Sequence, residues 1–220
     1  RHDVDTEHVS IKSSASGHAI IQINPEGENA IFIHGGTNLE DHTSLLEEGL
    51  ARAKPGDWLL IQNETSGNLK AIEIAKLRSM RVAFNMAPMN QRALDLPLDD
   101  IDLFIVNETE GAALTGEQVP ERILDQVAKT FPNAQIVLTL GEQGAWYQDA
   151  KARQHAPARK VQVVDTTGAG DTFTGFFLAG LINGLEPLVS LHQGCAAAGI
   201  SVERPGAATS IPSLDEIKSQ

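Results

Sequence analysis

The sequence predicts an α/β fold of three layers, in which helices cover both faces of a mostly parallel sheet and a small β flap lies beside it. From residue 38 onward, short apolar runs alternate with amphipathic segments, and this alternation is typical of strand–helix units in a parallel sheet. Before residue 38, two β-rich runs are joined by a turn-forming stretch. The 220 residues, 41% of them hydrophobic, suit a globular chain, so we expect a single domain over residues 1–220.

The flap comes first along the chain. The stretch "HAIIQINPEGENAIFIHGG" covers residues 18–36, and "NPEGEN" joins its two β-rich halves, which predicts a hairpin. We expect residues from about 8 to 36 to contribute to this β lid.

Strands and helices then alternate. The expected strands are continuous apolar runs, which favours burial on both faces; they are "DWLLIQNE" (57–64), "RVAFNMAP" (81–88), "DLFIVNE" (102–108) and "QIVLTLG" (135–141). The amphipathic segments beside them predict helices: "LEDHTSLLEEGLARA" (39–53), "SGNLKAIEIAKLRSM" (66–80) and "PERILDQVAKTF" (120–131).

Polar groups end each expected strand. In open α/β sheets the ligand crevice lies outside the carboxyl ends of the strands, so these groups should face one cleft. The alternative for any single one is the ordinary polarity of a loop. The groups are Asn63, Glu64, Asn85, Asn107, Glu108, Thr139, Gly141 and Asp165.

Composition narrows the class of protein. With 17 Lys and Arg against 29 Asp and Glu, the net charge of −12 argues against binding to nucleic acid or to an anionic membrane. The single cysteine, Cys195, excludes an internal disulfide and is expected to be a buried structural thiol. No apolar run approaches the roughly 18 residues of a membrane span, and we expect a cytoplasmic protein. The seven histidines lack metal-ligand spacing.

The stretch "VVDTTGAGDTFTGFFLAGL" (163–181) carries the chemistry. We expect a strand to end at Asp165 and a helix to run from near Asp171 to about Gly184. The small residues between the two aspartates leave the N–H groups of a helix N-terminus uncovered, which favours phosphate binding. Asp171 either accepts the proton of a substrate hydroxyl at this anion site or caps the helix.

Two familiar phosphate-binding motifs are excluded. No Lys-Ser or Lys-Thr pair follows the glycines, so the stretch is not a P-loop. Phe173 stands where the dinucleotide fingerprint GxGxxG needs its last glycine.

These residues resemble the ribokinase-like family of carbohydrate kinases. "DTTGAGDTFTGFFLAGL" is similar to that family's second signature, D-T-x-G-A-G-D-x-F-x-G. "GENAIFIHGGTN", "VNETEGAALTG", "TLGEQGAWY" and "ERPGAATSIPSLDEI" resemble further family elements, in the family's order. The resemblance spans essentially the whole chain but starts inside the family pattern, with about the first third of a typical member absent.

The resemblance implies a site of defined roles. Asp171 would be the catalytic base on the sugar hydroxyl, which it also binds, and Gly168, Ala169 and Gly170 would form the anion hole. Asn107 and Glu110 would organise Mg²⁺, partly through water, and Glu64 would contact the sugar. The nucleotide site would be lined by Thr139, Gly141 and Gly144.

The resemblance also implies a potassium site. In family members that K⁺ activates, the counterpart of Asp165 joins carbonyl and hydroxyl oxygens around the cation. The matching positions here are Thr167, Ser201, Arg204, Gly206 and Ser210. A role for Asp165 in forming the turn is the alternative.

The expected activity is transfer of the γ-phosphoryl group of ATP to a sugar hydroxyl, with ribose as the expected sugar and ribose 5-phosphate as the product. Fructose, ketodeoxygluconate or a nucleoside are the alternatives within the family. A protein that binds nucleotide without turnover is the alternative outside it. We further expect a homodimer that pairs through the β lid.

Overall fold

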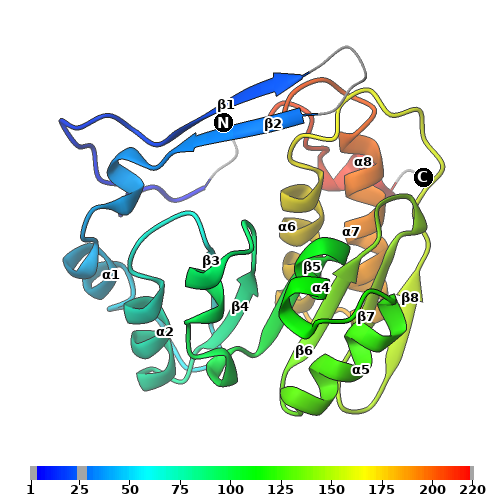
Figure 1. Cartoon of the computed structure of the whole chain (residues 1–220), viewed down its shortest axis with the longest axis horizontal. Helices are drawn as coiled ribbons and strands as arrows, with labels where there is room; N and C mark the ends of the chain where they lie inside the picture. The colour runs from blue at the N-terminus through cyan, green and yellow to red at the C-terminus, as the bar shows by residue number, and fades with distance from the viewer. Residues whose placement is uncertain (1–3, 24–28, 219–220) are drawn as a thin grey trace.

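A six-stranded sheet forms the centre of the computed structural model, which describes residues 4–23 and 29–218 (Figure 1). The strands follow one another across the sheet in chain order; β3 to β6 are parallel, and β7 and β8 are antiparallel. Their bounds are β3 Trp58–Gln62, β4 Arg81–Asn85, β5 Leu103–Asn107, β6 Gln135–Thr139, β7 Ala145–Gln148 and β8 Arg153–Ala156. The predicted α/β fold with a mostly parallel sheet is confirmed.

Helices cover the two faces of this sheet. One apolar cluster packs α2 and α5 against residues such as Phe84 and Phe104, and another packs α6 and α7 against Ile105 and Tyr147. Figure 1 shows α6 and α7 side by side on the far side of the sheet from α5. The helices are α1 Thr43–Gly49, α2 Asn68–Leu77, α3 Gln91–Leu94, α4 Glu108–Thr115, α5 Pro120–Thr130, α6 Ala169–Ile182, α7 Pro187–Ser201 and α8 Leu214–Lys218. Three short 3₁₀ turns are η1 Gly36–Leu39, η2 Leu98–Asp100 and η3 Gly141–Gln143.

Helices α6 and α7 pack closely against each other because glycines lie at the interface between them. A Cβ atom at Gly194 would lie 2.9 Å from two ring carbons of Phe173, and one at Gly180 would lie 2.6 Å from the Ser190 hydroxyl. Cys195, next to Gly194, is buried, and burial raises the pKa of its thiol to about 11. This bears out the structural role expected for the cysteine.

The flap is a separate two-stranded sheet of β1 His18–Ile23 and β2 Asn29–His34 (Figure 1). The strands are antiparallel, with His18 opposite His34 and Ile20 opposite Phe32. The turn "NPEGEN" falls largely outside the described residues. Residues 8–17, which we expect to contribute to the lid, form no strand, and pairing begins at His18.

Two strand predictions were wrong. Residues 157–168 form no strand, and the run that ends at Asp165 instead lies beside the end of α7, where the N–H groups of Val164 and Asp165 both donate to the Val202 carbonyl. Nor is β3 buried on both faces. No described strand pairs with its outer edge, and the side chain of Leu60 remains 44% exposed.

No helix among the described residues has the length and apolar character to cross a membrane.

Candidate functional site

A cavity of about 610 Å³ lies at the carboxyl ends of the parallel strands. Strand-end residues and the first turn of α6 line it together, as the polar strand ends predict. The predicted residues that it gathers are Glu64, Asn85, Asn107, Glu108, Glu110, Thr139, Gly141, Gly168, Gly170 and Asp171. Asn63 does not reach it, because its buried side-chain amide donates to the Pro88 carbonyl and to Asn90.

A second cavity, of about 500 Å³, adjoins the first beside β3 and α2. Apolar side chains such as Leu46, Leu59 and Ile61 form much of its wall. The residues that line both cavities are Gln62, Glu64, Asp171 and Thr174. The junction of the two cavities is therefore polar, and it surrounds the Asp171 carboxylate.

The helix α6 presents its N-terminus to this junction. Gly168 is the N-cap residue with a φ of +75°, a left-handed conformation that glycine adopts without strain. The helix thus begins two residues earlier than Asp171, where the sequence placed its start. The Ala169 N–H donates to the Thr166 carbonyl at 3.2 Å, so this member of the expected anion hole is occupied. Gly170 lines the cavity with open space where a Cβ would be.

The first-turn N–H groups at Gly170 and Asp171 make no hydrogen bond to any described residue. Unpaired N–H groups at a helix N-terminus bind anions, and the helix dipole adds to the attraction. The geometry therefore supports an anion site made by Gly168 to Asp171, with Ala169 contributing through the turn rather than through a free donor.

Asp171 does not cap the helix. The N-cap position is Gly168, and no side chain makes a capping hydrogen bond there. One carboxylate oxygen of Asp171, Oδ1, instead accepts a hydrogen bond of 2.9 Å from the side-chain amide Nε2 of Gln62, the last residue of β3. An exposed carboxylate at the mouth of an anion site can take up a proton from a bound hydroxyl.

Asn107 and Glu110 form a capping box at the start of α4. The Asn107 side-chain oxygen accepts from the Glu110 N–H, and Glu110 Oε2 accepts from the Asn107 N–H, both at 2.9 Å. Burial raises the pKa of Glu110, and the hydrogen bond from Asn107 partly opposes that rise. Oε1 of Glu110 bonds to no described residue, so a cation that needs oxygen ligands fits this position and would favour the ionised form.

Asp165 connects two segments of backbone. Its Oδ1 accepts from the Thr167 N–H and its Oδ2 from the Gly206 N–H, each at 2.9 Å. These bonds lower its pKa, the contacts with Thr167 first and that with Gly206 after them. The carboxylate therefore links the turn before α6 to the loop after α7, as expected if Asp165 forms the turn. Each carboxylate oxygen of Asp165 accepts only one of these N–H groups, so its remaining lone pairs still suit a cation.

The other predicted cation positions lie in or beside the same loop. The hydroxyl of Ser201 donates to the Ala198 carbonyl at 2.9 Å, and that of Ser210 to the Ala207 carbonyl at 2.7 Å. Hydroxyls used in this way keep their oxygen lone pairs for a further ligand. Ala207 lies 3.3 Å from the point where Gly168 would carry a Cβ, so the loop packs directly behind the anion site.

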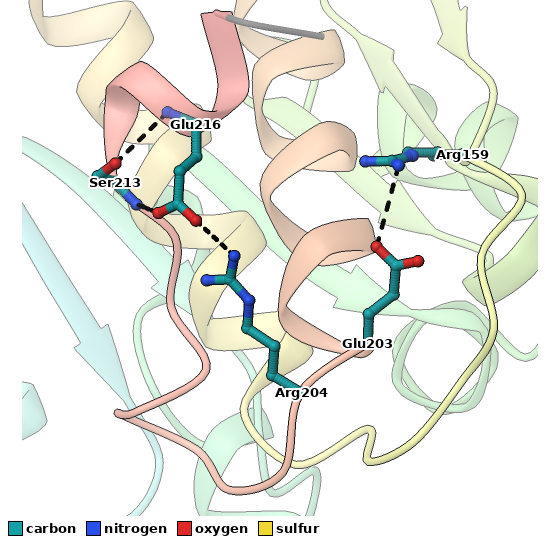
Figure 2. A network of polar contacts seen from close by, with 5 residues as sticks. All are labelled: Arg159, Glu203, Arg204, Ser213 and Glu216. Carbon is teal, nitrogen blue, oxygen red and sulfur yellow. Dashed lines mark hydrogen bonds and ion pairs between the residues drawn. The ribbon is translucent and has the colours of Figure 1, made fainter.

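A polar network holds the far end of this loop (Figure 2). The Arg204 guanidinium contacts the Glu216 carboxylate of α8, and Glu216 also accepts from the Ser213 N–H at 2.7 Å. These contacts, that from Ser213 first, lower the pKa of Glu216 to about 2. Arg159 and Glu203 form a second ion pair at 4.0 Å. The side chain of Arg204 thus anchors α8, while its backbone lies in the predicted cation loop.

Of the three residues expected at the nucleotide site, two line the larger cavity and one does not. Thr139 and Gly141 line the larger cavity at the end of β6. Gly144 does not line it; a Cβ there would lie 2.1 Å from the Ala156 carbonyl oxygen, so this glycine permits a close contact with the end of β8.

Two further residues, which no sequence motif singled out, line the junction of the cavities. Gln62 lies two positions before Glu64 in the run 57–64 that predicts a strand, and residues at that spacing in a strand point to the same side, so the sequence held a signal even though β3 ends at Gln62. Thr174 lies one helical turn after Asp171; its hydroxyl is buried and has no hydrogen-bond partner among the described residues. Nothing in the motif distinguished it from a core threonine.

Known proteins resemble this chain over nearly its whole length. The family model described as pfkB family carbohydrate kinase matches residues 1–214. A ribokinase from Staphylococcus aureus is 33% identical over 226 residues, which cover 97% of this chain and 73% of that protein. A ribokinase from Haemophilus influenzae is 34% identical over 220 residues, covering 97% and 72%.

Solved structures agree with this. The Arabidopsis thaliana ribokinase, solved with ribose and ATP, superposes with a TM-score of 0.78 at 27% identity, covering 94% of this chain and 69% of that one. The chain therefore spans about seven-tenths of the length of these relatives. The match over residues 1–214 shows that the chain belongs to the pfkB family of carbohydrate kinases, which are phosphotransferases with an alcohol group as acceptor.

Proposed function

We propose that the protein is an ATP-dependent ribose kinase, which transfers the γ-phosphoryl group to the primary hydroxyl of ribose. The observation that carries the proposal is the place of Asp171, whose carboxylate lies at the junction of two cavities and beside the unpaired N–H groups of α6. The ribokinase relatives and the Glu64 side chain at the same junction favour ribose.

The proposed reaction follows from this placement. The Asp171 carboxylate accepts the proton of the sugar hydroxyl, whose oxygen forms a bond to the γ-phosphorus while the bond from that phosphorus to the β–γ bridging oxygen breaks. ADP leaves with the electron pair. The N–H groups at Gly170 and Asp171 stabilise the negative charge on the transferring group, as a preorganised anion site does in phosphoryl transfer.

Binding of the substrates divides between the cavities. The larger cavity, with Thr139 and Gly141 at its edge, would take the nucleotide, and the junction with Glu64 would take the sugar. Asn107 and Glu110 would hold Mg²⁺, which when bound neutralises phosphate charge. Asp165 and the loop of residues 201–210 would hold K⁺ behind the anion site, ordering the turn without entering the reaction.

The test measures ADP release by wild type and Asp171→Asn with Mg-ATP and ribose, fructose, ketodeoxygluconate or adenosine, in potassium and in potassium-free buffer. We expect ribose-dependent turnover that potassium raises. In the variant this turnover should fall by at least roughly 10²-fold, because general-base catalysis contributes about that much, while ATP binding persists.

Each alternative has its own outcome in the same assay. Turnover on fructose, ketodeoxygluconate or adenosine in place of ribose would reassign the sugar and keep the chemistry. ATP binding without turnover on any sugar would support a non-catalytic nucleotide-binding protein. Equal rates with and without potassium would leave Asp165 with only its turn-forming role.

We also propose a homodimer that pairs through the lid hairpin, since Ile20, Phe32 and Ile33 leave large apolar side chains exposed on it.

A further inference from the structure

The hydrogen bond between β3 and α6 joins two residues that are 109 positions apart in the chain, and it is the one polar contact of the candidate base with a described residue. Gln62 Nε2 donates to Asp171 Oδ1 at 2.9 Å. Both side chains line both cavities, so the contact stands at the place where the proposed sugar and phosphate sites meet.

Gln62 is itself firmly placed. As the last residue of β3 it pairs with Asn85 of β4, and its carbonyl accepts a hydrogen bond of 2.7 Å from the buried side-chain amide of Asn68. Its amide donor therefore starts from a fixed backbone. Asp171, in contrast, is exposed and belongs to a helix whose first turn has no capping side chain.

The bond also distinguishes the two oxygens of the carboxylate. Oδ1 accepts from Gln62, whereas Oδ2 makes no hydrogen bond to any described residue. A hydrogen bond at one oxygen of a carboxylate restricts the orientation in which the group presents the other, and general-base catalysis requires the accepting oxygen within hydrogen-bond reach of the proton.

We propose that Gln62 is a positioning residue for the phosphoryl transfer: its side-chain amide holds Asp171 Oδ1 so that Oδ2 faces the sugar hydroxyl. This rests on the proposed function of Asp171 as the base. Gln62 acts on the reaction through Asp171, and the proton goes to Asp171 alone.

The first test replaces the amide by a side chain of similar length without a donor. Gln62→Met should lower kcat by roughly 10- to 100-fold, the scale of a misplaced catalytic group, and leave the KM for ATP unchanged. Gln62→Glu, which has the same shape as glutamine, should lower kcat further, because a second carboxylate repels Asp171. A residue that only fills space would tolerate glutamate.

The matched control is Gln91→Met. Gln91 Nε2, on α3, donates at 2.8 Å to Oδ1 of Asp95, the C-cap residue of that helix. The pair of groups is the same, and neither residue lines either of the two cavities described above. This variant should turn over ribose at the wild-type rate. Thermal unfolding of all variants detects any loss of folding, and a Gln62→Asn variant replaces Gln62→Met if the latter does not fold.

A double-mutant comparison separates positioning from general structural support. If Gln62 acts through Asp171, adding Gln62→Met to Asp171→Asn should leave the residual rate unchanged. A further fall of similar size in that background, or a wild-type kcat in Gln62→Met alone, would overturn the assignment while the role of Asp171 stands. Undiminished turnover in Asp171→Asn alone would overturn the proposed base and this inference with it.

Discussion

Glu110 shows how one carboxyl group can serve both the fold and a metal. It closes the capping box of α4 through Oε2, yet burial raises its pKa. A buried carboxyl group that is protonated in the folded state favours folding at low pH, and this contribution is lost as the pH rises. The residue is thus held at an energetic cost that a bound cation would offset.

Replacing Glu110 with glutamine should remove this dependence on pH. Between the ordinary pKa of the group, about 4.5, and its raised pKa in the folded protein, folded wild type retains a proton that the unfolded chain has lost. In EDTA, the free energy of unfolding of wild type should therefore fall relative to that of Glu110→Gln across this range. Glu108→Gln, on the same helical turn but exposed, is the control. Parallel pH profiles of wild type and Glu110→Gln in denaturant titrations would contradict the expectation.

Thr174 offers a second contrast between folding and binding. Its hydroxyl is buried without a partner among the described residues and lies at the junction of the cavities. Thr174→Val should raise the free energy of unfolding of the ligand-free protein by about 1 kcal/mol, since an unsatisfied polar group is removed. Should a ligand use the hydroxyl, the KM for sugar rises in the same variant. A destabilised valine variant would show that the hydroxyl is satisfied in solution.

At the scale of elements, the contact between α6 and α7 depends on Gly194. A Cβ at this position meets the ring of Phe173, which belongs to the same helix as Asp171. Gly194→Ala should lower the free energy of unfolding by about 1–3 kcal/mol, the usual cost of overpacking a core. Gly175→Ala is the matched control, because a Cβ there has open space; it should be stabilising by about 0.5–1 kcal/mol. Chemical denaturation of both variants measures the difference, and equal stabilities would contradict the close contact.

The elements also show which features a sequence can predict. The parallel strands and the helices between them were predicted because each is a local pattern: a continuous apolar run such as 102–108, or Pro120 in the first turn of α5. The strand expected to end at Asp165 was wrong because "KVQVV" has strand-like residues but pairs with the end of α7 instead of a sheet. The exposed edge of β3 depends on which strands lie beside it, and periodicity contains no such information.

The residues of the site also separate into those that a local motif identifies and those that depend on a distant contact. Asp171, Gly170, Asn107 and Glu110 were found from short motifs, and the structure brings them to one cavity. Gln62 was not singled out, because its significance comes from a contact across 109 residues. The distinction between a capping and a cavity-facing Asp171 likewise needed the position of Gly168.

At the scale of the whole molecule, the lid exposes apolar side chains on a small sheet whose edges pair with no other described strand. Its strands form a sheet of their own, and the Phe32 side chain is 59% exposed on it. If two copies pair through this hairpin, Phe32→Asp should shift the protein from dimer to monomer at micromolar concentration, because a carboxylate is costly to bury without a partner. Sedimentation velocity measures the mass. A wild-type monomer, or a dimer that Phe32→Asp leaves intact, would place the interface elsewhere.

The order of the strands in the sheet affects how the chain folds during its synthesis. Because β3 to β8 are added across the sheet in the order in which they are synthesised, each strand finds its neighbour already present, and the sheet can assemble progressively behind the ribosome. The helices that cover Ile105, Val137 and Tyr147 come last, however, after residue 168. A nascent chain that has emerged only as far as Gly168 would have helices on one face of the sheet and leave the apolar residues of the other face exposed. A chaperone that binds exposed apolar surface would therefore have a defined target in this state.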